Sequence, residues 1–261
     1  MKIAGIPAFV DQLATLSGEV ILPFFRAGAP IDDKSQGGVF DPVTEADQAA
    51  ERTIRQAIKA AFPAHGIIGE EYGAENANAE YVWILDPIDG TKSFISGMPL
   101  WGTLIALQHK GRPIYGMMHQ PFTDERFFGD GASAFWRGRQ GAERRLHTRA
   151  CAGLAQATVM TTSPLLIADS LLPRYRAVEQ QARLHRYGGD CYAYCMLAAG
   201  HIDLVIEAGL KTYDIAALIP IIEGAGGVVT TWDGGDAAAG GAIIAAGDKR
   251  SHAAALTLLA G

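Results

Sequence analysis

The pattern of apolar and polar positions predicts that helices and strands follow one another along the whole chain. Apolar residues recur at helical spacing over residues 6–25, and Pro23 is expected to kink the last turn of that helix. A continuous apolar run at 81–85, typical of a strand buried on both faces, leads directly into Asp86. The polar, Gly-rich segment 31–42 predicts a mobile loop.

An α+β half is expected over residues 1–145. The sequence Thr44-Glu-Ala-Asp47 resembles a capping box with Asp in the usual Glu position, and it opens a helix that Pro63 ends. A short strand at 66–69 leads into Glu70. Further strands, joined by turns, are expected at 100–108, 113–119, 125–129 and 133–137.

The basic segment 139–149 is interpreted as a linker to a C-terminal half, residues 146–261. In that half strands and helices alternate, which indicates a layered α/β arrangement. The strands are expected at 158–163, 185–188, 202–207, 228–232 and 242–246, and the helices at 171–182, 191–199 and 214–223.

Composition and charge narrow the class of protein. The chain has 261 residues, and 49% of them are hydrophobic, which is enough for a large core. A net charge of −6 without a block of Lys or Arg argues against a nucleic-acid or membrane partner. The N-terminus has no signal-like apolar run, so a cytoplasmic protein is expected. Cys151, Cys191 and Cys195 lack metal-type spacing and are interpreted as reduced core thiols.

Acidic residues at the ends of predicted strands or the starts of predicted helices form the candidate site. Asp86 ends the central strand, and the Asp89-Gly90 turn can fold a second carboxylate back towards it. Thr91 is suited to cap a helix whose N–H groups would face an anion. Because Mg²⁺ prefers oxygen ligands, a metal site beside a phosphate site is the first hypothesis. Taken singly, Asp89 also suits a plain turn, Asp214 a helix cap and Glu70 a solvated strand end.

Two segments resemble the signatures of the inositol monophosphatase superfamily. They are residues 83–91, Trp-Ile-Leu-Asp-Pro-Ile-Asp-Gly-Thr, and residues 213–227, in which Tyr213 and Gly224 depart from the usual pattern. The resemblance implies an α/β fold, the αβαβα sandwich of inositol monophosphatases and fructose-1,6-bisphosphatases, and a Mg²⁺-dependent phosphomonoesterase. It assigns Glu70, Asp86, the Ile88 carbonyl, Asp89 and Asp214 as metal ligands, Gly90 and Thr91 as phosphate contacts, and Asp47 as the partner of Thr91.

Three further segments, 94–103, 125–129 and 188–194, resemble the histidinol-phosphatase branch. This resemblance implies hydrolysis of L-histidinol phosphate in histidine biosynthesis. The implied step is direct attack by a metal-activated water, with Glu70, Thr91 and Asp47 as the catalytic residues. It also implies that Asp190 and Glu207 bind the substrate, since carboxylates suit the protonated amine and the imidazole of histidinol. The simpler alternatives are a helix cap for Asp190 and a solvated strand end for Glu207.

Two other functions stay open at this point. The nearest is an inositol-1-monophosphatase or a broad-specificity small-molecule phosphatase with the same metal chemistry. The other is a regulatory protein-binding module with a vestigial site, which the complete acid set and the lack of an exposed apolar run disfavour. A small phosphomonoester is the expected ligand, and a homodimer is the expected assembly.

Overall fold

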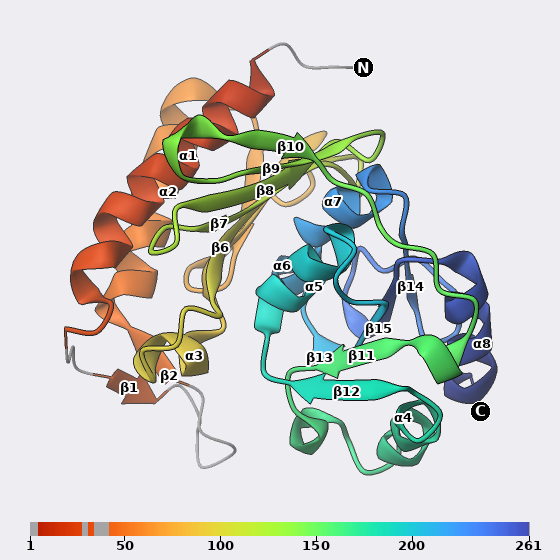
Figure 1. Cartoon of the computed structure of the whole chain (residues 1–261). Coiled ribbons are helices and arrows are strands. Elements are labelled where there is room, and N and C mark those ends of the chain that lie inside the picture. The colour runs from red at the N-terminus through yellow and green to blue at the C-terminus, as the bar shows by residue number, and fades with distance from the viewer. Residues whose placement is uncertain (1–4, 28–30, 34–41, 261) are drawn as a thin grey trace.

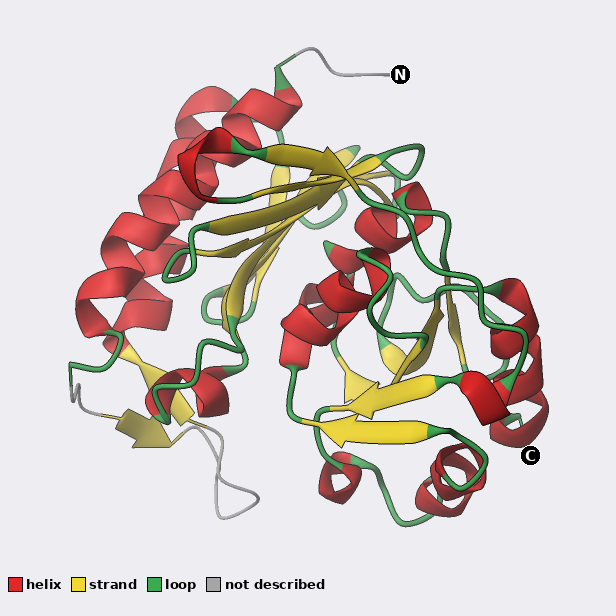
Figure 2. Cartoon of the chain, viewed as in Figure 1, coloured by secondary structure: helices red, strands yellow, loops and turns green. Residues whose placement is uncertain are grey.

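The computed structural model describes residues 5–27, 31–33 and 42–260, which form alternating layers of helices and β-sheets (Figure 1). From one side of the molecule to the other, the layers are helices, sheet, helices, sheet and helices (Figure 2). This order confirms the αβαβα sandwich that the resemblance implied.

The first layer consists of α1 and α2, which lie side by side against one face of the first sheet (Figure 1). Their bounds are Ile6–Ile21 and Glu45–Ala61. Apolar side chains of both helices, among them Val10, Leu13 and Ile54, pack around Trp83 of the sheet. Pro23 lies in a single 3-10 turn, Leu22–Phe24, that follows α1, so the helix ends at Ile21 where a kink in its last turn was expected.

The first sheet has eight strands in the order β10-β9-β8-β7-β6-β5-β3-β4. They are β3 (Gly66–Gly69), β4 (Gly73–Glu75), β5 (Tyr81–Asp89), β6 (Gly102–His109), β7 (Arg112–Gln120), β8 (Glu125–Gly129), β9 (Ala134–Arg137) and β10 (Glu143–Arg145). β3 and β5 are parallel, and the other neighbours are antiparallel. This pairing places Gly69, the last residue of β3, next to Leu85 of β5, one residue before Asp86.

The central strand is longer than the sequence suggested. β5 continues past Asp86 to Asp89, and its register with β6 shifts between these two residues. Pro87 lies inside this irregularity, where its missing N–H donor prevents regular ladder bonding. The shift alters the alternation of side chains, so Asp86 and Asp89 can serve the same side of the sheet.

Two segments expected to be irregular contain strands. Ile31–Asp33 (β1) pairs with Pro42–Thr44 (β2), so the loop prediction was wrong at both of its ends, and residues 34–41 lie outside the described residues. Within the expected linker, Glu143–Arg145 forms the edge strand β10, which pairs with β9. The charged side chains of β10 suit a solvent-facing edge.

Three helices fill the middle layer between the two sheets: α5 (Asp190–Ala198), α6 (Thr212–Ile215) and α7 (Leu218–Gly224). The single helix expected over 214–223 is therefore two helices. Pro220 explains the break, because it cannot donate the helical hydrogen bond to the carbonyl of Ala216. These helices pack on both sheets. The proposed division of the chain into two halves at residue 145 stays a prediction.

The second sheet has the order β12-β11-β13-β15-β14, and its outer face is covered by helices α4 and α8 (Figure 1). Its strands are β11 (Thr158–Thr161), β12 (Leu184–Tyr187), β13 (Leu204–Leu210), β14 (Val228–Thr231) and β15 (Gly241–Ala246). The covering helices are α4 (Leu172–Glu179) and α8 (Lys249–Leu259), of which α8 was not expected. The three cysteines are buried and unbridged, as predicted. Among the described helices, none has the length and apolar character to cross a membrane.

Candidate active site

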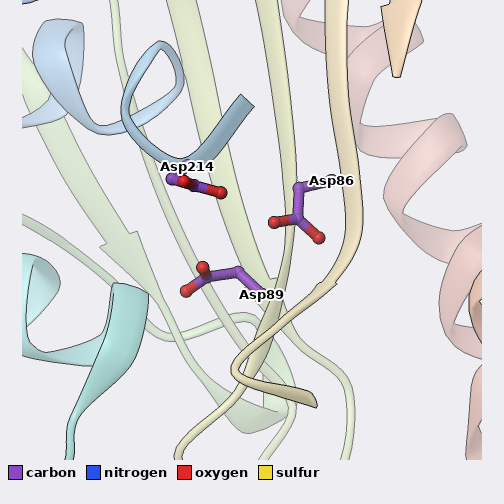
Figure 3. A group of neighbouring side chains, drawn as sticks. All are labelled: Asp86, Asp89 and Asp214. Carbon is purple, nitrogen blue, oxygen red and sulfur yellow. The ribbon is translucent and has the colours of Figure 1, made fainter. Parts of the chain in front are cut away.

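Three of the predicted metal ligands meet between the two sheets. One carboxylate oxygen each from Asp86, Asp89 and Asp214 lies within 4.8 Å of the other two. Figure 3 shows Asp86 and Asp89 on one stretch of chain and Asp214 on the segment that faces it. We call these three residues the carboxylate cluster. The sequence predicted its members, and the packing of α6 against β5 brings them together.

Hydrogen bonds fix the backbone around the carboxylate cluster. The Thr103 hydroxyl donates to the carbonyl of Pro87 at 2.8 Å and so holds the irregular part of β5. The Asp89 carboxylate accepts the backbone N–H of Cys191 at 2.6 Å, which ties it to the start of α5. The Asp214 carboxylate accepts the backbone N–H of Lys211 at 2.6 Å. Asp214 is the third residue of α6, and its bond to the N-cap residue Lys211 belongs to a capping box, so Asp214 helps to cap this helix as well as joining the cluster.

The electrostatics of the carboxylate cluster call for a cation. Burial raises the pKa of Asp86 well above its usual value, and repulsion from Glu70, Asp89, Asp214 and Asp47 raises it further. Burial is also the main reason that the pKa of Asp214 rises to about 7. Asp86 Oδ1 is buried without a hydrogen-bond partner among the described residues. A hard divalent ion would satisfy that oxygen and offset the repulsion, so the cluster fits a metal site.

Glu70 lies beside the cluster rather than at its centre. It follows β3, is partly buried, and its backbone N–H donates to the carbonyl of Leu85 at 3.2 Å. Its charge contributes to the raised pKa values of Asp86 and Asp214, so its carboxylate lies close to both. The interpretation of Glu70 as a solvated strand end is therefore wrong.

The predicted phosphate loop forms the short helix α3, Thr91–Ile95. Gly90, with φ of 88°, is its N-cap, and Thr91 is its first residue, so Thr91 is not the cap that the sequence suggested. The Thr91 hydroxyl donates to the Ile88 carbonyl at 3.1 Å. The Asp47 carboxylate accepts the N–H and the hydroxyl of Thr44 at 2.9 and 2.6 Å. The expected link from Thr91 to Asp47 stays a prediction.

A cavity of about 380 Å³ joins the carboxylate cluster to the other predicted site residues. The predicted residues that line it are Asp89, Gly90, Thr91, Asp190, Glu207 and Asp214. Residues to which the resemblance gave metal, phosphate and substrate roles therefore face one space, although Glu70, Asp86 and Ile88 are not among its lining residues.

Asp190 and Glu207 are held inside this cavity by hydroxyl groups. Glu207 is 6% exposed and accepts both the N–H and the hydroxyl of Thr162 at 2.8 Å. Burial raises its pKa to about 7. The Asp190 carboxylate accepts the Ser93 hydroxyl at 2.9 Å, and its backbone φ is 43°. Glu207 is thus no solvated strand end, and Asp190 is the first residue of α5, with Gly189 as the N-cap.

Sequence reasoning missed Ser93, Thr162 and Tyr194. Tyr194 lines the cavity, is 3% exposed, and its hydroxyl has no hydrogen-bond partner among the described residues. One signal could have found it: Tyr194 follows Asp190 by four residues, which puts both on one face of a helix. Thr162 and Ser93 carry no comparable signal, because their contacts join distant parts of the chain.

Comparisons with known proteins agree with this geometry. Residues 6–260 match the model of the inositol monophosphatase family. The bifunctional phosphatase IMPL2, chloroplastic, of Arabidopsis thaliana is 45% identical over 265 residues, covering 95% of this chain and 73% of that protein. The histidinol-phosphatase of Chlorobaculum parvum is 36% identical over 221 residues, covering 83% of this chain and 82% of that protein.

A solved structure extends the agreement to the whole fold. The inositol monophosphatase from Zymomonas mobilis superposes with a TM-score of 0.87, and it is 38% identical in sequence. The alignment covers 100% of both chains. The chain therefore belongs to the inositol monophosphatase family and is a phosphatase of that superfamily, a hydrolase that acts on phosphomonoesters.

Proposed function

We propose that this protein hydrolyses L-histidinol phosphate to L-histidinol and phosphate in histidine biosynthesis, with Mg²⁺ as its cofactor. The observation that carries the proposal is the single cavity that is lined by Asp89 and Asp214 of the carboxylate cluster and by two further acids, the partly buried Asp190 and the buried Glu207. A phosphate ester bound at the cluster would extend its alcohol towards these acids. The name of the Chlorobaculum parvum relative supports the same substrate.

Five oxygen donors would hold the metal ion. They are the carboxylates of Glu70, Asp86, Asp89 and Asp214 and the carbonyl of Ile88. Hard oxygen ligands of this kind suit Mg²⁺, and the unpartnered Asp86 Oδ1 supports the assignment. When bound, Mg²⁺ polarises the phosphoryl oxygens and stabilises the leaving alkoxide.

The protein's own groups bind the phosphate and orient the attacking water. The backbone N–H groups at Gly90 and Thr91 would contact the phosphate. The Thr91 hydroxyl donates to the Ile88 carbonyl, so its lone pairs are free to accept a hydrogen bond from the attacking water, and Glu70 would orient that water from the other side. As the water attacks, its proton would pass to the Thr91 oxygen while the Thr91 hydroxyl gives its own proton to the Asp47 carboxylate behind it.

The residues that line the cavity give little support to a mechanism with a covalent phosphoenzyme intermediate. Cys191 lines the cavity, but burial raises the pKa of its thiol well above the usual value. A thiol held in its neutral form is a poor nucleophile. Direct attack by water therefore remains the proposed step.

Asp190 and Glu207 would select the cationic substrate. Histidinol carries a protonated amine and an imidazole, whereas inositol offers only neutral hydroxyls. A hydrogen bond to a charged group contributes about 1.5 to 3 kcal/mol. Losing one such bond should therefore lower kcat/KM for histidinol phosphate by roughly ten- to a hundred-fold.

The test is phosphate release from L-histidinol phosphate and from inositol 1-phosphate by Asp190→Asn and Glu207→Gln. Asp233→Asn, at an exposed carboxylate outside the cavity, serves as the matched control. We expect both cavity variants to lose activity on histidinol phosphate and to keep their rates on inositol 1-phosphate. Equal losses on both substrates would indicate a structural role, and unchanged rates would exclude these acids from substrate binding. Full turnover in excess chelator would refute the role of the metal.

Inositol 1-phosphate is the second candidate substrate, and the similarity to the Zymomonas mobilis inositol monophosphatase favours it. The same assay decides between the two, because the better substrate is the one with the higher kcat/KM for the unmodified protein. We also propose a cytoplasmic homodimer, which analytical ultracentrifugation and fractionation of cells would test.

A further inference from the structure

Helix α2 carries a stripe of three buried charged residues. The proposed reaction uses only the first of them, Asp47. Asp47, Glu51 and Arg55 follow one another at intervals of four residues and are 1%, 0% and 7% exposed. This spacing puts them on one face of the helix. Fully buried Glu and Arg side chains are rare unless they are paired, so this stripe calls for an explanation.

Glu51 and Arg55 together hold the turn that follows β3. The Glu51 carboxylate accepts the backbone N–H of Glu71 at 2.8 Å and that of Tyr72 at 3.2 Å. It also accepts Arg55 Nε at 2.7 Å. The Arg55 guanidinium in turn donates to the carbonyl of Gly73. The two side chains thus bind N–H groups on one side of the turn and a carbonyl on the other.

The approach of Glu51 to this turn is close enough to require a glycine. A Cβ atom on Gly69 would lie 2.1 Å from a Glu51 carboxylate oxygen, so a side chain at this position would displace that carboxylate from the turn. The residue after this glycine is Glu70, whose own N–H is bonded to Leu85 of β5. The backbone of Glu70 is therefore fixed by β5 on one side and by Glu51 of α2 on the other.

We propose that Glu51, neutralised by Arg55, is a positioning residue that holds Glu70 against the carboxylate cluster. The inference rests on the proposed function in one respect, namely that Glu70 is a ligand of Mg²⁺. Groups that orient a metal ligand from behind commonly change metal affinity or activity by about 10- to 100-fold when they are mutated. A merely structural ion pair would change stability and leave the affinity for the metal unaltered.

The experiment measures Mg²⁺ binding to the whole substrate-free protein by isothermal titration calorimetry. Glu51→Gln keeps the shape of the side chain but removes the negative charge to which Arg55 and the N–H groups of Glu71 and Tyr72 donate. We expect its Kd for Mg²⁺ to rise by about 10- to 100-fold. Its turnover should fall at low Mg²⁺ and recover at saturating Mg²⁺, because the ligand itself is still present.

The matched control is Glu179→Gln. Glu179 is 7% exposed, pairs with Arg176 on the same helix and accepts the Tyr175 hydroxyl at 3.0 Å, but it lies on α4, in the outer layer. This variant should lower the melting temperature and leave the Kd for Mg²⁺ unchanged. A similar loss of Mg²⁺ affinity in both variants would overturn the positioning role.

Two further variants keep the test decisive. Arg55→Lys keeps the positive charge but loses the guanidinium group that donates to the Gly73 carbonyl. It should fold and bind Mg²⁺ several-fold more weakly than the unmodified protein. If Glu51→Gln does not fold, the Mg²⁺ affinity of Arg55→Lys tests the positioning role in its place. Glu70→Gln gives the effect of losing the ligand itself. If Glu70→Gln weakens binding while folded Glu51→Gln and Arg55→Lys do not, the positioning role fails and the metal site stands. If the unmodified protein binds no Mg²⁺, the proposed function fails as well.

Discussion

Replacing one acid of the carboxylate cluster should stabilise the metal-free protein at neutral and alkaline pH. The chosen change is Asp214→Asn, which removes a negative charge and keeps a carbonyl oxygen for the Lys211 N–H. Burial, with added repulsion from Glu70, raises the pKa of Asp214 from its usual 3.8 to about 7 in the folded protein. The folded state therefore binds this proton more tightly than the unfolded chain does.

The sign of the pH dependence follows from that difference. The stabilisation from this proton is complete below about pH 4 and is lost as the pH rises through about 7. A difference of about three pH units corresponds to about 4 kcal/mol. Allowing about 1 kcal/mol for a weaker bond to Lys211 leaves a gain of about 3 kcal/mol.

The assay is urea unfolding followed by tryptophan fluorescence, in excess chelator, at pH 5 and pH 8. Asp214→Asn should exceed the unmodified protein in unfolding free energy by about 3 kcal/mol at pH 8 and by much less at pH 5. Added Mg²⁺ should stabilise the unmodified protein more than the variant, because the variant lacks one ligand. A variant that is less stable than the unmodified protein at pH 8 without metal would refute the reasoning.

Three other substitutions test separate parts of the structure. Thr91→Ala should lower kcat by about 10²- to 10⁴-fold with little change in melting temperature, since Thr91 is not the N-cap of α3; near-normal turnover would exclude it from catalysis. Tyr194→Phe should raise the unfolding free energy by about 1 kcal/mol, because it removes a buried hydroxyl without a partner among the described residues, and a lower melting temperature would contradict this. Gly116→Ala should cost about 1–3 kcal/mol, because its Cβ would lie 2.0 Å from the Ala217 carbonyl oxygen; an unchanged melt would show that β7 and α7 can separate.

Features that depend on neighbours in the chain were predicted well. The helical stripes of α1 and α2, the contact between Asp47 and Thr44 at the start of α2, and the buried run of β5 all follow from local periodicity or capping chemistry. These signals are strong because the side chains that produce them lie within one or two turns of each other. The resemblance extended them to the whole sandwich.

Several features that depend on distant contacts were not predicted. The edge strand β10 exists because β9 offers it a partner, and its own charged residues give no sign of a strand. The continuation of β5 to Asp89 depends on its pairing with β6. The role proposed for Glu51 depends on a turn some twenty residues later in the chain, and its spacing from Asp47 alone indicates only a shared helix face.

The sequence by itself determined the chemical character of the candidate site. Acids beside a strand end, a Gly-Thr turn and no reactive nucleophile already indicate a hard cation and a phosphate. The tertiary structure alone decided that Asp214, from the second half of the chain, comes within 4.8 Å of Asp86 and Asp89, and that Glu207 is buried in the same cavity. The physical reason is that residue type and local backbone preference are properties of short segments. The distance between segments is set by how helices such as α6 pack against the sheets.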